Sequence, residues 1–496
     1  MNAMNIDKKR AELSPAQLAL LEKRLKGRPA PRRAERTIPR RADKSFAPLS
    51  IAQRETLEFA RSSAVPSGYL GASLRMSGEL HLNALRQAAT EIDRRHEILR
   101  SSFGTVAGEP VQLIGTPAAH PVLLIDLTDR PAATRERAAR RLAAQELERP
   151  FDLTQPPLWR LTVIRLDSTD HVLVIAAHHL AADFLSLGLL IREVGVLYDA
   201  FAKSRPSPLK DLDIQYGDWA AWQRECLARG DFDRELAYWR ERLAGRPPVS
   251  HLPFSRPRPA IRTYKGSARM LSLGQQLASE LRTLSKQEKV SLYATLLATF
   301  NVLIHGYTGQ RDIILGRGVT GRTSAAIEKL IGCFVNMVVM RNRVDGGRPF
   351  VNFLKETLAV AEAAYSNQDL PFGKLVTTLQ CEPDSNCPPI VQIAFNLYTA
   401  PSFQEMATDR LDVFDLGEFK PPDMALFQDA IFGIHDTGNS LIAEMKYNRD
   451  LFDSTSVDNM LHDYKAVLET VSAHRDKPII DLIGLANVAA CASKAL

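Results

Sequence analysis

Two adjacent histidines and a nearby aspartate form the most specific chemical pattern in this sequence. They are His178, His179 and Asp183 in the stretch AAHHLAAD, in a chain with 11 histidines among 496 residues. An imidazole with an ordinary pKa of about 6.5 accepts a proton from an alcohol or amine at neutral pH. A buried carboxylate one helical turn further on needs a cation beside it, because an isolated buried charge is costly. The pattern predicts an acid–base site in which one histidine does the chemistry.

Two other interpretations of this triplet stay open at this point. A metal site would use both imidazoles and the carboxylate, although adjacent residues of a strand point to opposite faces. A purely structural pair would have both rings satisfied by hydrogen bonds. The opposite-face argument also predicts that one ring faces a cleft while the other packs inward.

The residues around the triplet predict a buried strand before it and a helix after it. HVLVIAA (171–177) is a continuous apolar run, WRLTVIRL (159–166) alternates, and a helix is expected from about residue 182 to residue 200. In α/β proteins, reactive side chains sit at strand ends that face a cleft. The triplet occupies such a position.

Helical and strand periodicity alternate along the rest of the chain. We expect helices at 82–103, 135–148, 232–243 and 290–305, and strands at 312–315, 334–341, 390–398 and 440–447. The glycines of GRGVTGRT (316–323) could cradle an anion, but the stretch is interpreted as a turn. This mixture of elements in both halves predicts two α/β lobes with a cleft between them.

Overall composition excludes several classes of protein. Hydrophobic residues make up 45% and charged residues 24% of the chain, as in soluble globular proteins. A bilayer span needs about 20 consecutive apolar residues, and the longest run near the middle is Val172 to Ala177. The opening residues lack the apolar core of a secretory signal, and the five scattered cysteines are typical of reduced thiols. We expect a cytosolic protein that does not enter a membrane.

Positive charge gathers at the N-terminus. Residues 1–45 hold 13 Lys or Arg and 5 Asp or Glu, a net charge of +8, whereas the whole chain carries +6. Ser14 to Gln17 (SPAQ) predicts a helix-capping box, and residues 28–48 predict an extended connector. A basic segment attracts nucleic acid, membranes or acidic protein tails alike, but the remainder of the chain lacks a basic stripe. We expect no nucleic-acid partner, and either a solvated linker or a docking element in residues 1–45.

Several further segments resemble the motifs of one enzyme family, in that family's order. Beside HHxxxD, four stretches are similar to its RHExLRTxF, YxDYAVW, IGxFVNTxxxR and NQDxPFE motifs: RHEILRSSF (95–103), YGDWAAW (216–222), IGCFVNMVVMR (331–341) and NQDLPF (367–372). On these residues the chain resembles the condensation domains of nonribosomal peptide synthetases, members of the chloramphenicol-acetyltransferase-like acyltransferases. The resemblance runs from about residue 50 to residue 452 and beyond.

The resemblance implies a fold and a set of site residues. The fold is expected to be α/β, with two chloramphenicol-acetyltransferase-like lobes in a V-shaped arrangement around a central tunnel. His179 corresponds to the family's catalytic histidine and His178 to its structural neighbour. Asp183 corresponds to an aspartate that pairs with an arginine of the other lobe, here Arg341, and Asn396 to an asparagine near the reacting centre. We expect residues 1–45 to be the basic docking or linker segment, 46–215 the N-terminal lobe and 216–496 the C-terminal lobe.

Three residues depart from the family pattern. Phe184 replaces the glycine after the motif aspartate, and Gly373 replaces the glutamate of NQDxPFE. Glu55 stands at the arginine position of the start element SxAQxR(L/M)W. These departures bear on the acceptor and the carrier geometry more than on the chemistry.

The resemblance implies a freestanding condensation enzyme. It would transfer an acyl chain from the phosphopantetheine thioester of an acyl or peptidyl carrier protein to a hydroxyl or amine, on a small-molecule or carrier-bound acceptor, in nonribosomal peptide or polyketide biosynthesis. Ester formation with chain release is slightly favoured over amide formation. No metal or redox cofactor of its own is implied, since the phosphopantetheine arrives on the carrier. Two rivals remain: an acyl-CoA-dependent acyltransferase of the same superfamily, and an inactive platform that recruits carrier proteins.

Overall fold

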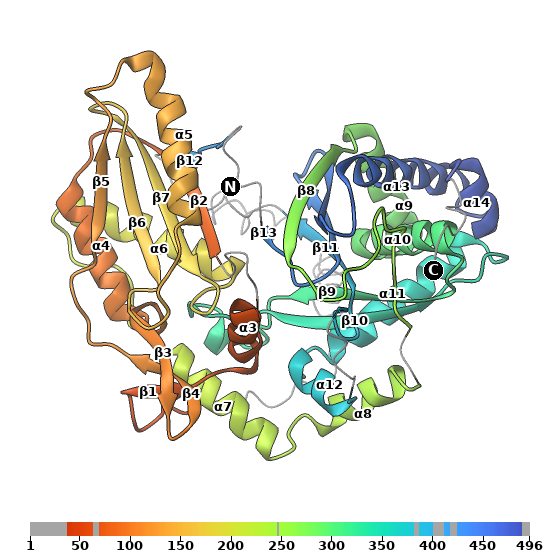
Figure 1. The fold of residues 1–496 in the computed structure, drawn as a ribbon, viewed down its shortest axis with the longest axis horizontal. Helices are drawn as coiled ribbons and strands as arrows, with labels where there is room; N and C mark the ends of the chain where they lie inside the picture. The colour runs from red at the N-terminus through yellow and green to blue at the C-terminus, as the bar shows by residue number, and fades with distance from the viewer. Residues whose placement is uncertain are drawn as a thin grey trace, which may run out of the picture. The chain divides into compact units, whose positions relative to one another are not determined.

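The computed structural model describes residues 37–62, 69–245, 248–380, 386–399, 411–416 and 424–488 (Figure 1). The chain divides into two units, Met1–Ile38 and Pro39–Leu496, and all elements named below belong to the second. The predicted capping box and most of the basic head lie outside the described residues. The described part contains helices and three sheets, which confirms the α/β prediction. The V-shaped arrangement and the lobe boundary at residues 215/216 stay predictions.

A five-stranded sheet carries the histidine motif. Its order is β12-β2-β7-β6-β5, and all neighbours are antiparallel except β5 and β6. The strands are β2 (Tyr69–Ser77), β5 (Val122–Asp126), β6 (Trp159–Arg165), β7 (Asp170–His178) and β12 (Leu411–Val413). Every residue of β7 after the first is buried, which accounts for its continuous apolar sequence. The predictions for both central strands are confirmed.

Three helices lie beside this sheet: α4 (Leu82–Arg95), α5 (Ala132–Glu148) and α6 (Phe184–Ala202). The single helix predicted over 82–103 is wrong after Arg95, because the backbone becomes extended at His96 (φ −116°, ψ 97°). A short 3₁₀ turn, η1 (Glu97–Arg100), and strand β3 (Ser101–Val106) follow. His96 Nε2 lies 2.9 Å from Glu193 Oε2 of α6, and this buried contact anchors the helix-to-strand junction.

A seven-stranded sheet forms the second half of the described fold, in the order β10-β9-β11-β14-β15-β8-β13. Its strands are β8 (Lys265–Ser272), β9 (Asp312–Val319), β10 (Asn336–Arg343), β11 (Ile393–Thr399), β13 (Met424–Ala425), β14 (Ala430–Asp436) and β15 (Leu441–Asn448). Its helices include α9 (Gln275–Gln287), α10 (Leu292–Thr308), α11 (Phe350–Ser366), α13 (Ser454–His474) and α14 (Ile479–Leu485). The strands predicted in this half are confirmed, whereas β8, β13 and β14 were not predicted.

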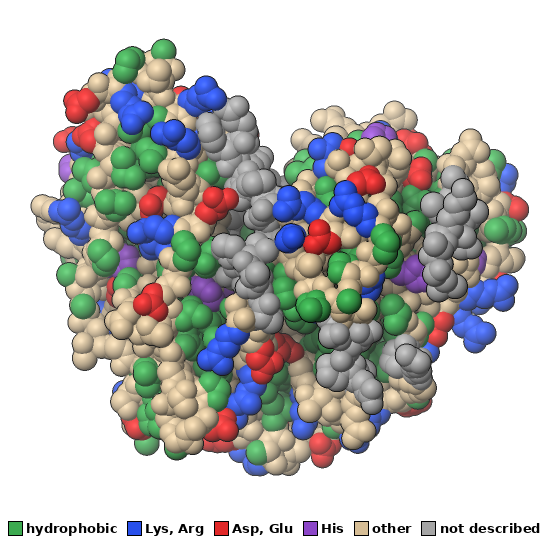
Figure 2. All heavy atoms as spheres, in the orientation of Figure 1, with side chains coloured by type: hydrophobic (Ala, Val, Ile, Leu, Met, Phe, Trp, Pro, Cys, Tyr) green, Lys and Arg blue, Asp and Glu red, His purple; other side chains and the backbone are tan. Residues whose placement is uncertain are grey.

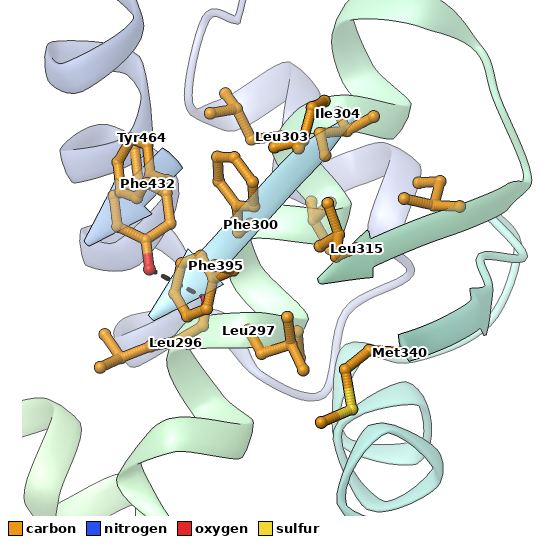
Figure 3. Close-up of a cluster of buried hydrophobic side chains, with 14 of the residues drawn as sticks. Leu296, Leu297, Phe300, Leu303, Ile304, Leu315, Met340, Phe395, Phe432 and Tyr464 are labelled. Atoms are coloured by element: carbon orange, nitrogen blue, oxygen red, sulfur yellow. Dashed lines mark hydrogen bonds between the residues drawn. The ribbon is translucent and has the colours of Figure 1, made fainter. Parts of the chain in front are cut away.

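Aromatic rings fill the core between this second sheet and its helices (Figure 3). The ring of Phe300 on α10 lies 5.2 Å from that of Phe395 on β11 and 4.6 Å from that of Phe432 on β14. Tyr464 of α13 packs on Phe432 at 4.8 Å and donates its hydroxyl hydrogen to the Leu296 carbonyl (2.9 Å). Because that hydroxyl is bonded, the tyrosine is buried without an unsatisfied polar group. This core fixes the strands that approach the histidine motif from the second half.

The remaining elements connect the two large sheets. They are the small sheet β1-β4-β3, with β1 (Phe46–Pro48) and β4 (Glu109–Ile114), and the helices α3 (Ile51–Ser62), α7 (Tyr216–Ala228), α8 (Asp233–Arg242) and α12 (Phe372–Thr378). Arg41, which the sequence assigned to the basic head, is nearly buried and forms ion pairs with Glu97 and Asp218 (2.7 Å to Asp218). The end of that predicted segment is therefore held by the fold.

Charged side chains of both signs are interspersed on the face drawn in Figure 2. This face thus lacks the basic stripe that is typical of nucleic-acid-binding proteins. Among the described residues, no single helix is long and apolar enough to cross a membrane; the bent pair α9 and α10, at 106°, meets the criteria of length and composition only when taken together.

Candidate active site

The turn that follows β7 places the two histidines in different surroundings. The amides of Ala181 and Ala182 donate to the His178 carbonyl at 2.8 and 3.1 Å, which closes the turn. The His178 side chain is buried beside the rings of Tyr69 (5.8 Å) and Phe151 (6.1 Å). The His179 side chain, one residue on, is only half-buried. The prediction that one ring packs inward agrees with this geometry.

His178 is held as a neutral imidazole. Its Nδ1 accepts a hydrogen bond from the Leu180 amide (3.1 Å), so this nitrogen carries a lone pair rather than a proton. Burial, and to a smaller extent the neighbouring charge of His179, lowers the pKa of His178 to about 3. A ring that stays neutral and is bonded to its own turn shapes the loop. It is poorly suited to exchanging protons at neutral pH.

His179 is the histidine whose ring faces the second half of the fold. Its Nδ1 lies 3.7 Å from Cys333 Sγ, a buried thiol whose pKa is raised by burial. The contact orients the ring through Nδ1, and among the described residues no protein group is hydrogen-bonded to Nε2. Nε2 is therefore the nitrogen placed to accept a proton from a bound nucleophile. Cys333 occupies the variable position of the IGxFVN pattern, so the sequence does not mark it as a contact of His179.

Asp183 caps α6 instead of facing a substrate. One carboxylate oxygen accepts from the Ser186 amide (2.7 Å), as is usual for an aspartate at a helix N-cap. The other accepts from the Phe334 amide (3.1 Å) on the segment that leads into β10. The Asp183 amide in turn donates to the Gly332 carbonyl (3.0 Å). The carboxylate thus joins the start of α6 to the second half of the fold.

The cation beside Asp183 is Arg322, not Arg341. The Arg322 guanidinium lies 3.1 Å from the Asp183 carboxylate, and both side chains are nearly buried, at 4% and 6% exposed. The same group donates to Ser186 Oγ (2.7 Å) and stacks on the Phe334 ring at 4.1 Å. The requirement for a cation, derived from the sequence, is confirmed, but the residue predicted to supply it is wrong.

Arg341 belongs to a different ion pair. It lies on β10 opposite β9 and binds Asp312 on that strand, with a shortest contact of 2.7 Å. Its remaining nitrogen, Nη1, donates to the carbonyls of Arg242 and Ala244. These contacts direct the guanidinium toward α8 and away from Asp183, which explains the error in the predicted pair.

Arg322 reaches Asp183 because of the turn after β9. Gly321 has a positive φ of 63°, and a Cβ there would lie 3.0 Å from the Phe334 carbonyl carbon, so glycine suits this position. The Arg322 side chain also donates to the carbonyls of Ile327 (2.7 Å) and Leu330 (2.8 Å). The prediction of a turn over GRGVTGRT (316–323) is wrong for its first four residues, which belong to β9. Nothing in the spacing of the sequence distinguished Arg322 from the other lysines and arginines of the chain.

Asn396 serves the second sheet in the contacts described. Its Oδ1 accepts from the Gly318 amide on β9 (3.1 Å), and its amide group donates to the Tyr398 hydroxyl (3.2 Å). β11 and β9 are paired in register only at Ala394 and Gly316, so the side chain continues the connection beyond that pair. Its role near a reacting centre stays a prediction.

The triplet does not converge as a metal site would. His178 is bonded within its own turn and Asp183 is occupied by Arg322 and two amides. Across the residues that the structure describes, no group of three His, Cys, Asp or Glu side chains is arranged to hold a metal ion. One half-buried imidazole remains, that of His179. The turn next to it is held by the ion pair between Asp183 and Arg322.

Two α/β halves joined beside a strand-end histidine are the features of a chloramphenicol-acetyltransferase-like fold. The family model "Condensation domain" matches residues 43–486, and the chain belongs to the condensation-domain family. Enzymes of this family form amide or ester bonds.

Known proteins similar to this chain come from peptide biosynthesis. One of the linear gramicidin synthase subunits of Brevibacillus parabrevis is 38% identical over 436 residues, 88% of this chain and 8% of that protein. Phosphinothricin tripeptide synthetase PhsC of Streptomyces viridochromogenes is 36% identical over 456 residues, 91% of this chain and 41% of that protein. The chain therefore spans less than half the length of these relatives.

Solved structures show the same fold. The X-domain from teicoplanin biosynthesis has a TM-score of 0.78 at 23% identity, covering 90% of this chain and 99% of that one. The condensation domain from the monacolin K polyketide synthase MokA has a TM-score of 0.73 at 21% identity, covering 88% and 99%.

Proposed function

We propose that this chain transfers an acyl group from the phosphopantetheine thioester of a carrier protein to an amine or hydroxyl acceptor. The observation that carries the proposal is the ring of His179, oriented through Nδ1 in the turn that follows β7. The relatives' role in peptide synthesis supports a carrier-bound donor. The carrier itself, the cytosolic location, docking through residues 1–45 and chain release as an ester all belong to this proposal.

In the proposed reaction, the acceptor nitrogen or oxygen attacks the thioester carbonyl. His179 Nε2 takes the proton of the nucleophile as the new carbon–nitrogen or carbon–oxygen bond forms. The carbon–sulfur bond then breaks, and the proton passes to the departing thiolate of the carrier. Asp183 and Arg322 hold the turn and take no proton. No metal or redox cofactor enters these steps.

The test is intact-protein mass spectrometry of an acyl-loaded carrier mixed with the enzyme and a set of amines and alcohols. We expect loss of the acyl group from the carrier and an ester or amide of matching mass, both abolished in His179→Ala. The control is His462→Ala, which removes an exposed histidine on α13 and should leave turnover unchanged. Turnover with acyl-CoA but not with the carrier would instead favour the CoA-dependent rival. Carrier binding without any product would favour the recruitment platform.

A further inference from the structure

Two departures from the family pattern meet at one place in the structure. Glu55 lies on α3 and Gly373 lies in the first turn of α12, and they are more than 300 positions apart in the sequence. A Cβ on Gly373 would lie 2.9 Å from Glu55 Cδ and 3.2 Å from Cγ, closer than side-chain carbons ordinarily approach. The Glu55 side chain therefore occupies the space that a residue larger than glycine would need.

The two substitutions change the charge at this contact. The family motifs have arginine at the position of Glu55 and glutamate at the position of Gly373, a pair of opposite charges. Here a single carboxyl group stands between the helices. Among the described residues it forms no ion pair or hydrogen bond, although its side chain is only partly exposed. Burial and the negative charge of Glu58 raise the pKa of Glu55 to about 8, so the fold disfavours its charged form.

Helix α3 also borders the candidate active site. Gln53 Nε2 donates to the carbonyl of Leu180, the residue after His179 (2.9 Å). Thr56 Oγ1 lies 4.0 Å from Cys333 Sγ, the atom that contacts the His179 ring. Glu55 precedes Thr56, and after burial and the charge of Asp183 its own charge is among the causes that raise the pKa of the Cys333 thiol, so the carboxyl group lies near that atom. An acceptor bound next to His179 would have to extend past Cys333 to meet the Glu55 carboxyl group.

We propose that Glu55 is a specificity residue that binds a positively charged amine of the acceptor. The inference rests on the proposed function, and it assigns the acceptor class: a nucleophile that carries a second, protonated amine. The protonated amine would place a positive charge beside Glu55. The family motifs supply a positive charge here through their arginine. Glycine at 373 leaves room for the Glu55 side chain between the two helices. A hydrogen bond between charged partners in a partly buried place would favour the cationic acceptor by about 10- to 100-fold.

The test compares acceptors that share a nucleophile and differ in the second amine. These are 1,4-diaminobutane against butylamine, and 4-(dimethylamino)butan-1-ol against butan-1-ol, each with the same acyl-loaded carrier. We expect the wild-type chain to favour the cationic member by at least 10-fold in kcat/KM, mostly through KM. Glu55→Gln should abolish this preference by raising KM for the cationic member. A wild type without preference, or a Glu55→Gln variant that keeps it, would overturn the proposal.

Two further variants separate the charge of Glu55 from its shape and its surroundings. Glu58→Gln removes an exposed acid from the same helix and should keep the preference. Glu55→Arg combined with Gly373→Glu rebuilds the family's charge pair and should abolish the preference while the chain still folds. If this double variant kept the preference, Glu55 would not be its source.

A binding measurement distinguishes failure of this proposal from failure of the proposed function. Calorimetry with 1,4-diaminobutane and butylamine, in the absence of carrier, needs no turnover. If no acceptor gives product but the diamine binds at least 10-fold more tightly to wild type than to Glu55→Gln, the condensation proposal fails and the Glu55 assignment stands. Equal binding of both amines to wild type would overturn the assignment whether or not the enzyme turns over.

Discussion

Replacing Arg322 by alanine tests whether this residue is the ionic partner of Asp183 in the candidate site. The variant leaves the Asp183 carboxylate, 6% exposed in its side chain, with two amide donors and no cation. Removing one partner of a buried ion pair costs about 3–5 kcal/mol of unfolding free energy, because the other charge stays buried. The variant also loses bonds to two carbonyls and the packing on Phe334. We expect Arg322→Ala to lose at least about 3 kcal/mol.

Arg341→Ala provides the matched control for this loss. Its pair with Asp312 is 21% and 41% exposed, and exposed ion pairs contribute at most about 1 kcal/mol. Urea unfolding followed by tryptophan fluorescence gives both values, and Trp219 reports locally because its ring lies 4.6 Å from that of Phe334. Equal costs for the two variants, or a larger cost for Arg341→Ala, would refute the reasoning. The double variant Arg322→Ala/Asp183→Asn should lose less than the sum of its single variants, since the two residues share one interaction.

Two further predictions concern pH and packing. The pKa of His178 is about 3 in the folded state, so between about pH 6.5 and pH 3 only the unfolded chain binds this proton. The unfolding free energy therefore falls as pH decreases through this range. At pH 5 the unfolding free energy is lower by about 2 kcal/mol than at pH 8 because of this residue. In urea titrations, His178→Asn should lose about 2 kcal/mol less than the wild type between these two pH values. Equal pH dependence of the two proteins would contradict the assignment. Gly332→Ala should destabilise by about 1–3 kcal/mol or more, because its Cβ would lie 2.7 Å from Tyr216 Cγ. Gly484→Ala, in α14 with nothing within 4 Å of the new Cβ, should be neutral or stabilising in thermal unfolding; a cost equal to that of Gly332→Ala would argue against the packing at Gly332.

Local pattern was sufficient for the strands and the turn that carry the histidines. The apolar run before His178 indicated a strand buried on both faces, and β7 is one. The alternation of side chains in a strand predicted the opposite surroundings of His178 and His179, although the structure places His179 in the turn after β7. The helix predicted over 82–103 failed beyond Arg95, because the periodic pattern continues while a buried contact of His96 with Glu193 ends the helix. Periodicity cannot register a partner almost 100 residues away.

The family, the motif and the need for a cation beside Asp183 could all be inferred without coordinates. The identity of that cation could not, because it depends on the turn at Gly321 and on the direction in which each arginine leaves its strand. Likewise, Glu55 and Gly373 were separate departures in the sequence, and tertiary packing placed one against the other. The contact of Cys333 with His179 arose in the same way. Side-chain partners across the two halves are set by long-range packing, whose information is spread over the whole chain, whereas strands, turns and caps depend on residues close in sequence.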